Sequence, residues 1–234
     1  MKKIIYNLFL FCSLIIFVGC EGITTEDTSK ITYYVNFELS GDNPLLVKVG
    51  DKFNDPGVIA TEGDKDVTSN VKSSGSVNTN AIGVYYITYS AKNVDGFDAS
   101  TTRTVAVYNP NITADISGNY VVAAGSHRYA FASGAQVAYS GYPVKISKLA
   151  PGLFQVSDFF GGYYDKRAGY GASYAMTGYM SLNEDNSIDL LTSIVNGWGD
   201  GLDDLDDASY DPESGTIQWG AVYVGAYSFN VILK

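Results

Sequence analysis

Apolar side chains recur at every second position in many short segments of this chain. The alternation is clear in residues 34–39, 85–90, 143–148, 216–221 and 227–234. A period of two places one face of a strand in a core and the other in water. Turn-forming Gly, Pro, Asn and Asp residues separate these segments. We therefore predict an all-β chain.

Two changes in composition divide the chain after its N-terminal segment. Residues 20–31 are polar and lack periodicity, which is typical of a flexible tether. Asn109-Pro110-Asn111 marks a second break. We predict a β-sandwich over 32–109 and a second all-β domain over 110–234. The second domain is an antiparallel meander, for which a closed barrel and a sandwich both remain open.

The first residues have the plan of a secretory signal, with two lysines followed by an apolar run over 4–18. The run is too short for a membrane-spanning helix, which needs about 20 apolar residues. Phe17-Val18-Gly19-Cys20 resembles a lipobox, the motif cleaved just before a lipid-bearing cysteine. We expect a signal peptide over 1–19 and a lipid on Cys20. The alternative is an ordinary signal peptide with a chance cysteine at its end.

Charge and cysteine content exclude several classes of function. The net charge is −10, and loss of the two lysines of the signal would leave −12. Nucleic acids and anionic lipid surfaces both need basic patches, so we expect neither partner and a membrane contact through the lipid anchor only. Cys12 would leave with the signal, and no thiol would then remain for a disulfide or a cysteine metal site.

A family resemblance rests on spaced segments in the first domain. They are Val49-Gly50-Asp51, Asp55-Pro56-Gly57, Asp64 to Thr68, Gly83 to Ala91, Gly96 and Arg103 to Val107. In this order they resemble the Ig-like domain of bacterial surface proteins, over about residues 37–108. Asn93 and Phe97 depart from residues common in that family. The resemblance implies a spacer or presentation module.

Residues 112–234 resemble, more weakly, the uncharacterised C-terminal domain that follows this Ig-like module in lipoproteins of the Bacteroides group. That resemblance implies no known site. Together the two resemblances imply an outer-membrane lipoprotein that faces the cell exterior.

Aromatic residues and glycines concentrate in two segments of the second domain. The candidate ligand-binding residues are Tyr163, Tyr164, Tyr170, Tyr174 and Trp198. Aromatic rings stack on the apolar faces of sugars, and neighbouring glycines allow close approach to the backbone. Trp198 lies between two glycines, where a loop is expected. The alternative is that the rings are core or hairpin packing, because Tyr and Phe favour strands. We read Trp219, on an alternating strand, as core.

An acidic run follows Trp198 and begins with Asp200, Asp203 and Asp204. Clustered carboxylates can hold calcium, which takes 6–8 oxygen ligands. The spacing does not match a calcium-binding loop, so a solvated acidic loop is the favoured interpretation and calcium stays the weaker one. No other cofactor is expected.

Catalytic patterns are weak in this chain. His127 is the single histidine, and neither Ser126 nor Ser133 lies in a nucleophile elbow. We predict a non-catalytic surface protein that binds a polysaccharide or oligosaccharide through its second domain. The alternatives are a structural or adhesive protein with an envelope protein partner and, less favoured, a hydrolase.

Overall fold

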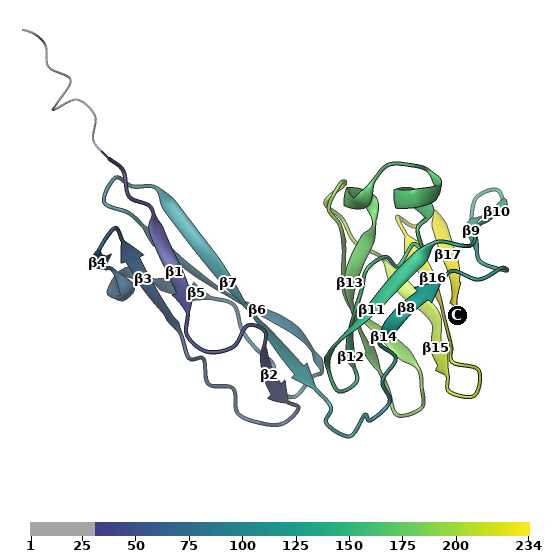
Figure 1. Cartoon of the computed structure of the whole chain (residues 1–234), viewed down its shortest axis with the longest axis horizontal. Helices are drawn as coiled ribbons and strands as arrows, with labels where there is room; N and C mark the ends of the chain where they lie inside the picture. Colours follow the sequence, from purple (N-terminus) through teal and green to yellow (C-terminus); the bar gives the residue numbers. More distant parts are fainter. Residues whose placement is uncertain (1–30) are drawn as a thin grey trace, which may run out of the picture.

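The computed structural model describes residues 31–234, which form two β-domains (Figure 1). The proposed signal peptide and Cys20 lie outside the described residues, as does most of the tether. The part of the chain from residue 31 onward has no helix that is long and apolar enough to cross a membrane. The described residues form strands joined by loops and short helical turns, so the fold class is all-β, as the alternation predicts.

The N-terminal domain packs a three-stranded sheet, in the order β1-β3-β4, against a four-stranded sheet, in the order β2-β7-β6-β5. Its strands are β1 (Val35–Leu39), β2 (Leu45–Lys48), β3 (Val58–Glu62), β4 (Lys65–Asp66), β5 (Lys72–Ser74), β6 (Gly83–Lys92) and β7 (Asp98–Tyr108), with a short helix η3 (Thr68–Asn70). The predicted turns are present, because Gly57 and Gly96 adopt φ of 77° and 87°.

A buried arginine ties the loops of this domain together. Arg103 on β7 is 0% exposed. Its guanidinium donates to the backbone carbonyls of Ser40, Asp42 and Gly57. Its Nε lies 3.4 Å from the carboxylate of Asp55. One charged side chain therefore joins β7 to two loops that are more than forty residues earlier in the chain.

The C-terminal domain has two five-stranded sheets, in the orders β10-β9-β17-β16-β15 and β14-β13-β12-β11-β8. Its elements are β8 (Gly118–Val121), β9 (His127–Ala130), β10 (Gln136–Ala138), β11 (Pro143–Ala150), β12 (Leu153–Val156), η4 (Tyr163–Arg167), η5 (Ala172–Tyr174), β13 (Met176–Leu182), β14 (Ile188–Val195), β15 (Asp204–Asp211), β16 (Thr216–Tyr223) and β17 (Tyr227–Leu233).

The two sheets form a sandwich whose edges touch. Isolated bridges join Val122 to Leu233 and Ser187 to Ser209. Between the sheets lies one core, in which Phe154, Met180 and Phe229 are fully buried. Trp219 belongs to this core at 2% exposure, which confirms its interpretation as a core residue.

The acidic run is an edge strand, and the prediction of a solvated loop is wrong for most of it. β15 covers Asp204–Asp211, is the last strand of its sheet beside β16, and meets the other sheet at the isolated bridge between Ser209 and Ser187. Leu205 and Ala208 face the core, and a bulge separates them. This spacing breaks the strict alternation and hides the strand from sequence analysis. Outward carboxylates on an edge strand discourage pairing with another chain.

The two domains meet through a small apolar cluster. Val84 and Ala106 of the N-terminal domain pack with Ala150 and Leu153 of the C-terminal domain. All four are buried, so the contact is dry at its centre. The short helices η4 and η5 cap the end of the C-terminal domain that lies away from this contact (Figure 1).

Candidate functional site

The glycine-rich segment before Tyr163 turns sharply after β12. Gly161 and Gly162 have φ of 60° and 80°, values that L side chains rarely adopt. Gly162 begins η4, a single turn of π-helix over Tyr163–Arg167. Such turns occur disproportionately at functional sites. The turn carries two tyrosines and two basic residues to the end of the sandwich.

Asp158 holds the base of this segment. Its carboxylate accepts hydrogen bonds from the backbone N–H groups of Phe160, Gly162 and Met176, at 2.9, 2.7 and 2.9 Å. Asp158 is only 4% exposed. Burial raises the pKa of this carboxyl to about 6, against the opposing effect of the three donors. The segment is thus fixed to β13.

Four of the five predicted aromatic residues come together here. The ring centroid of Trp198 lies 4.9 Å from those of Tyr164 and Tyr174. It lies 6.2 Å from that of Tyr170. Trp198 is 42% exposed and Tyr170 is 56% exposed. We call Tyr164, Tyr170, Tyr174 and Trp198 the aromatic surface.

The loop that carries Trp198 connects β14 to β15 and is held by backbone bonds. The N–H groups of Trp198 and Gly199 donate to the carbonyl of Val195, and that of Gly197 donates to Ser173 of η5. A Cβ at position 197 would lie 2.6 Å from the ring of Tyr174. Glycine at this position therefore allows Tyr174 to pack against the loop.

Tyr163 does not belong to the aromatic surface. It is 5% exposed, and its ring packs against Tyr139 and Phe229 with both centroids 5.2 Å away. Adjacent residues on one helical turn point in different directions, and here Tyr163 points into the core. The prediction that Tyr163 contacts a ligand is wrong for this reason.

Tyr223 supports the aromatic surface from below, and sequence analysis missed it. Its ring stacks on Trp198 at 6.0 Å with the planes 26° apart. Its hydroxyl donates to both carboxylate oxygens of Asp200, at 3.0 and 3.1 Å. Burial, and then the bond to Asp200, raises the pKa of Tyr223. A tyrosine at the end of an alternating strand gives no signal of this contact.

The three aspartates suggested for calcium have separate partners. Asp200 accepts from Tyr223, Asp203 accepts from the N–H of Gly225, and Asp204 accepts from that of Leu205. Within residues 31–234 no three His, Cys, Asp or Glu side chains gather to hold a metal ion. Asp200, Asp203 and Asp204 are thus not gathered into one group within residues 31–234.

The hydroxyl groups of the two serines near His127 hydrogen-bond to backbone N–H groups. Ser126 is buried, and its hydroxyl oxygen accepts a hydrogen bond from the N–H of Ile232 at 3.0 Å. Ser133 is exposed, and its hydroxyl oxygen accepts one from the N–H of Ala135 at 3.3 Å. Nδ1 of His127 lies 3.0 Å from the carbonyl oxygen of Gly125. No hydrogen bond joins His127 to either serine in the described part of the chain.

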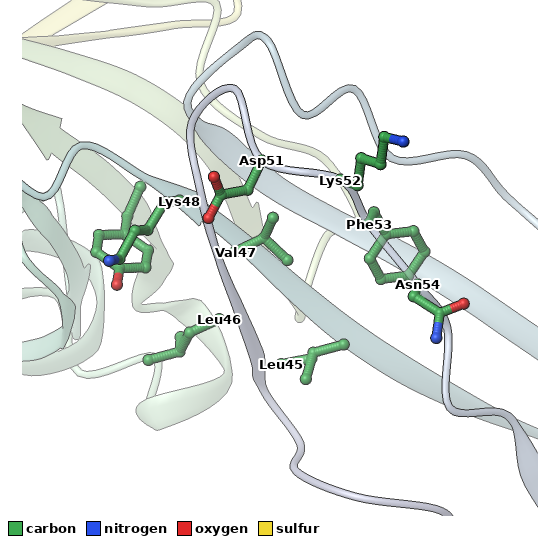
Figure 2. Close-up of a pocket in the computed structure, with 9 residues that line it drawn as sticks. Leu45, Leu46, Val47, Lys48, Asp51, Lys52, Phe53 and Asn54 are labelled. Atoms are coloured by element: carbon green, nitrogen blue, oxygen red, sulfur yellow. The ribbon is translucent and has the colours of Figure 1, made fainter.

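A pocket of about 300 Å³ lies in the N-terminal domain beside β2 (Figure 2). Its rings, Phe53 and Tyr108, are half-buried, and Phe53 packs against the domain core. In Figure 2 the amine of Lys52 points away from Leu45 and Leu46. The pocket thus lacks the converging exposed rings that distinguish the aromatic surface.

Comparison with known proteins places both domains. Residues 37–107 match the family model of a bacterial surface protein, Ig-like domain. Residues 109–234, over half of the chain, match the family model of a C-terminal domain. The lipoprotein BT2262 from Bacteroides thetaiotaomicron is 44% identical, and the alignment spans 86% of this chain and 100% of that one, with a TM-score of 0.49. The chain belongs to the BT2262 family of lipoproteins. As a family member it is a surface-associated lipoprotein with an Ig-like domain.

Two more distant structures come from ZmpB of Clostridium perfringens. One holds CBM51-2 in complex with GlcNAc and INT domains, is 18% identical, and aligns over 52% of this chain and 28% of that one, with a TM-score of 0.28. The other holds the M60 catalytic domain with CBM51-1 and CBM51-2, is 16% identical, and aligns over 55% and 14%, with a TM-score of 0.30. Likenesses this slight do not bear on the ligand of the BT2262 family. No curated protein matches the chain.

Proposed function

We propose that this lipoprotein is a non-catalytic glycan-binding protein of the outer cell surface, with the aromatic surface as its binding site. The observation that carries the proposal is the exposure of Trp198 among three tyrosines. A solvent-exposed indole in contact with other rings is unusual on a protein without a partner. The apolar faces of sugar rings are suited to such a surface.

The aromatic surface is organised before any ligand arrives. Asp158 fixes the base of the η4 segment, and the bond from Gly197 to Ser173 ties the Trp198 loop to η5. Tyr223 supports the indole from below. Rings that are already in place lose less conformational freedom on binding, which favours affinity.

Asp200 offers a polar contact at the edge of the surface. Its carboxylate is exposed, and the hydroxyl of Tyr223 is the one group within residues 31–234 that donates to it. A carboxylate has lone pairs for about four hydrogen bonds, so it can also accept from sugar hydroxyls. Stacking with Trp198 and hydrogen bonding at Asp200 together suit a neutral sugar ring.

The Ig-like domain acts as the spacer in this proposal. The helices η4 and η5, which carry Tyr164 and Tyr174 of the aromatic surface, lie at the end of the C-terminal domain away from the interdomain contact (Figure 1). The apolar cluster around Ala106 and Leu153 holds the two domains together. A lipid on Cys20 would then anchor the protein and leave the site accessible from outside.

A glycan-array screen of the mature chain, residues 21–234 without lipid, tests the proposal. We expect binding to a defined set of glycans and a loss of about tenfold or more in affinity for Trp198→Ala, equivalent to about 1.4 kcal/mol. Phe97→Ala is the matched control, because Phe97 is 49% exposed but lies in the other domain. No binding across the array, or equal binding by Trp198→Ala, would overturn the proposal. Tyr and Trp are also enriched where proteins bind proteins, so an envelope protein would then be sought as the partner.

A further inference from the structure

Arg128 occupies an unusual place on β9. It stands directly opposite Phe229 of β17, which is 0% exposed. Residues opposite each other on antiparallel strands share a face of the sheet, so the Arg128 side chain begins on the core face. Its Nε is buried and has no hydrogen-bond partner within residues 31–234. A buried donor without an acceptor is costly, and a functional reason for it is worth seeking.

Two arginines, Arg128 and Arg167, reach the ring of Tyr163. The guanidinium carbon of Arg128 lies 5.1 Å from the ring centroid of Tyr163, and that of Arg167 lies 5.2 Å from it. Arg128 also lies 4.7 Å from the ring centroid of Tyr227. The faces of aromatic rings attract cations and hold them in place. β9 and η4, which are distant in sequence, thus each place one positive charge against the ring of Tyr163.

Within residues 31–234 neither arginine forms a salt bridge with an acidic side chain. In the described part of the chain the salt bridges involve Lys92, Arg103, Lys148 and Lys166, and Arg128 and Arg167 are in none of them. Asp165, the acidic residue of η4, pairs with Lys166 at 2.9 Å. The whole chain has 25 acidic and only 15 basic residues. Two arginines on one tyrosine ring, both without a carboxylate partner within residues 31–234, stand out in so acidic a protein.

The arginines adjoin the aromatic surface through Tyr164. The positive charge of Arg128 opposes the rise that burial causes in the pKa of Tyr164, and the ring of Tyr164 contacts Trp198 at 4.9 Å. The ring of Tyr164 also contacts that of Tyr163, which both guanidinium groups cover, at 5.2 Å. Contacts therefore run without a gap from the cations to the exposed indole.

From this arrangement we infer that the site selects a glycan with an acidic sugar, whose carboxylate binds Arg128 and Arg167 while the neighbouring sugars stack on the aromatic surface. The inference rests on the proposed glycan binding and names the class of ligand. Guanidinium groups bind carboxylates through paired N–H donors, which favours a planar acid group over a neutral hydroxymethyl group. Arg167 is exposed, so the acid is accessible to it from solvent.

The charge of the rest of the protein limits the ligand to few acidic groups. The net charge of −10 repels long polyanions, and Asp200 lies on the Tyr223 side of Trp198. A single acidic sugar at one end of a neutral oligosaccharide fits this arrangement. Its carboxylate lies at the arginines, and its neutral sugars lie near Trp198 and Asp200. Its binding should weaken with added salt, because the partly exposed ion pairs are screened.

The test compares two oligosaccharides that differ in one group, a terminal glucuronic acid against a terminal glucose, and a second pair with galacturonic acid and galactose. Isothermal titration measures both members against the mature chain, the double variant R128Q/R167Q and the control K48Q/K145Q. Lys48 and Lys145 are exposed and without ion pairs in residues 31–234, so the control changes the net charge equally.

We expect the acidic member of at least one pair to bind about tenfold more tightly to the mature chain and to the control. The double variant should bind the acidic and neutral members about equally and keep its affinity for the neutral one. If Arg128 proves necessary for folding, R167Q alone and R128K with R167Q provide milder losses, and each should reduce the preference.

Equal binding of acidic and neutral members by the mature chain would overturn the inference and leave glycan binding intact. A preference that survives in R128Q/R167Q would overturn it as well. If no member of any pair binds and the glycan array is also blank, the proposed function itself fails.

Discussion

The ring of Tyr223 lies 6.0 Å beneath the indole of Trp198, with the two planes 26° apart. The first residue is buried at 5% exposure and the second is 42% exposed. One ring of the core thus supports one ring of the surface. This pair links the packing of the C-terminal domain to its proposed binding site, and the first prediction concerns it.

Tyr223→Phe keeps this stack but removes the hydrogen bond to Asp200. We expect a loss of about 1 kcal/mol in the free energy of unfolding, typical of one hydrogen bond. Glycan affinity should fall only a few-fold, because the indole keeps its support and Asp200 loses one orienting partner. Urea denaturation and titration calorimetry measure the two effects. A variant that loses all binding would show that the hydroxyl acts directly on the ligand.

Gly197→Ala tests the close approach of Tyr174 to the Trp198 loop. The added Cβ would lie 2.6 Å from the ring of Tyr174, so that ring must move. Tyr174 is half-buried, and its displacement should cost little stability while it disturbs the aromatic surface. We expect weaker glycan binding with a nearly unchanged melting temperature. Asn196→Ala, at the neighbouring exposed position, is the control and should bind normally.

Asp158 makes a prediction about pH. The pKa of its carboxyl is raised from 3.8 to about 6, mainly by burial, so the folded state favours the protonated form. The contribution of Asp158 to the free energy of unfolding is therefore fully present below pH 3.8, and it is lost as the pH rises through about 6. A rise of about two pKa units corresponds to an effect on the order of 3 kcal/mol.

The measurement is urea denaturation between pH 4 and pH 7.5 of the mature chain and of Asp158→Asn. Between these limits the unfolding free energy of the mature chain should decline relative to that of the variant. The variant should be less stable at pH 4, because its amide cannot replace both acceptor oxygens. Parallel curves would mean that the three backbone donors outweigh burial and that Asp158 stays ionised.

Arg103→Met should destabilise the N-terminal domain. The variant leaves the carbonyls of Ser40, Asp42 and Gly57 without their donor and Asp55 without its cation. Breaking a buried charge network in this way costs about 3–5 kcal/mol. Lys92→Met is the control, because Lys92 pairs with Asp98 on the surface and is 65% exposed. The control should change thermal unfolding hardly at all, and an equal effect of both variants would contradict the network's role.

The alternation of side chains predicts much of the fold because each strand is a local feature. Residues 85–90 and 216–221 were expected as strands from their period of two and lie within β6 and β16. β15 was missed for two reasons. A bulge separates its core positions, Leu205 and Ala208, and most of its exposed residues are acidic. The alternation of neighbouring side chains cannot reveal a strand whose bulge arises in its pairing with another strand, here β16.

The candidate site could be predicted only in part, because it depends on long-range contacts. Composition points to Trp198 and Tyr170, which are exposed as a ligand-binding role requires. It does not separate Tyr163 from Tyr164, since one turn of π-helix decides which ring enters the core. It also does not find Arg128, which reaches the site because β9 pairs with β17, about one hundred residues later.

The most direct test of glycan binding at the aromatic surface is an ¹H–¹⁵N spectrum of the indole N–H groups during a glycan titration. The chain has two tryptophans, and Trp198→Ala assigns their signals. Trp219 is an internal reference, because it is 2% exposed and its indole donates to the carbonyl of Phe159 at 2.8 Å. We predict that the Trp198 signal shifts saturably with the affinity found by calorimetry while that of Trp219 stays in place. A glycan that binds by calorimetry and leaves the Trp198 signal unmoved would place the site elsewhere on the protein.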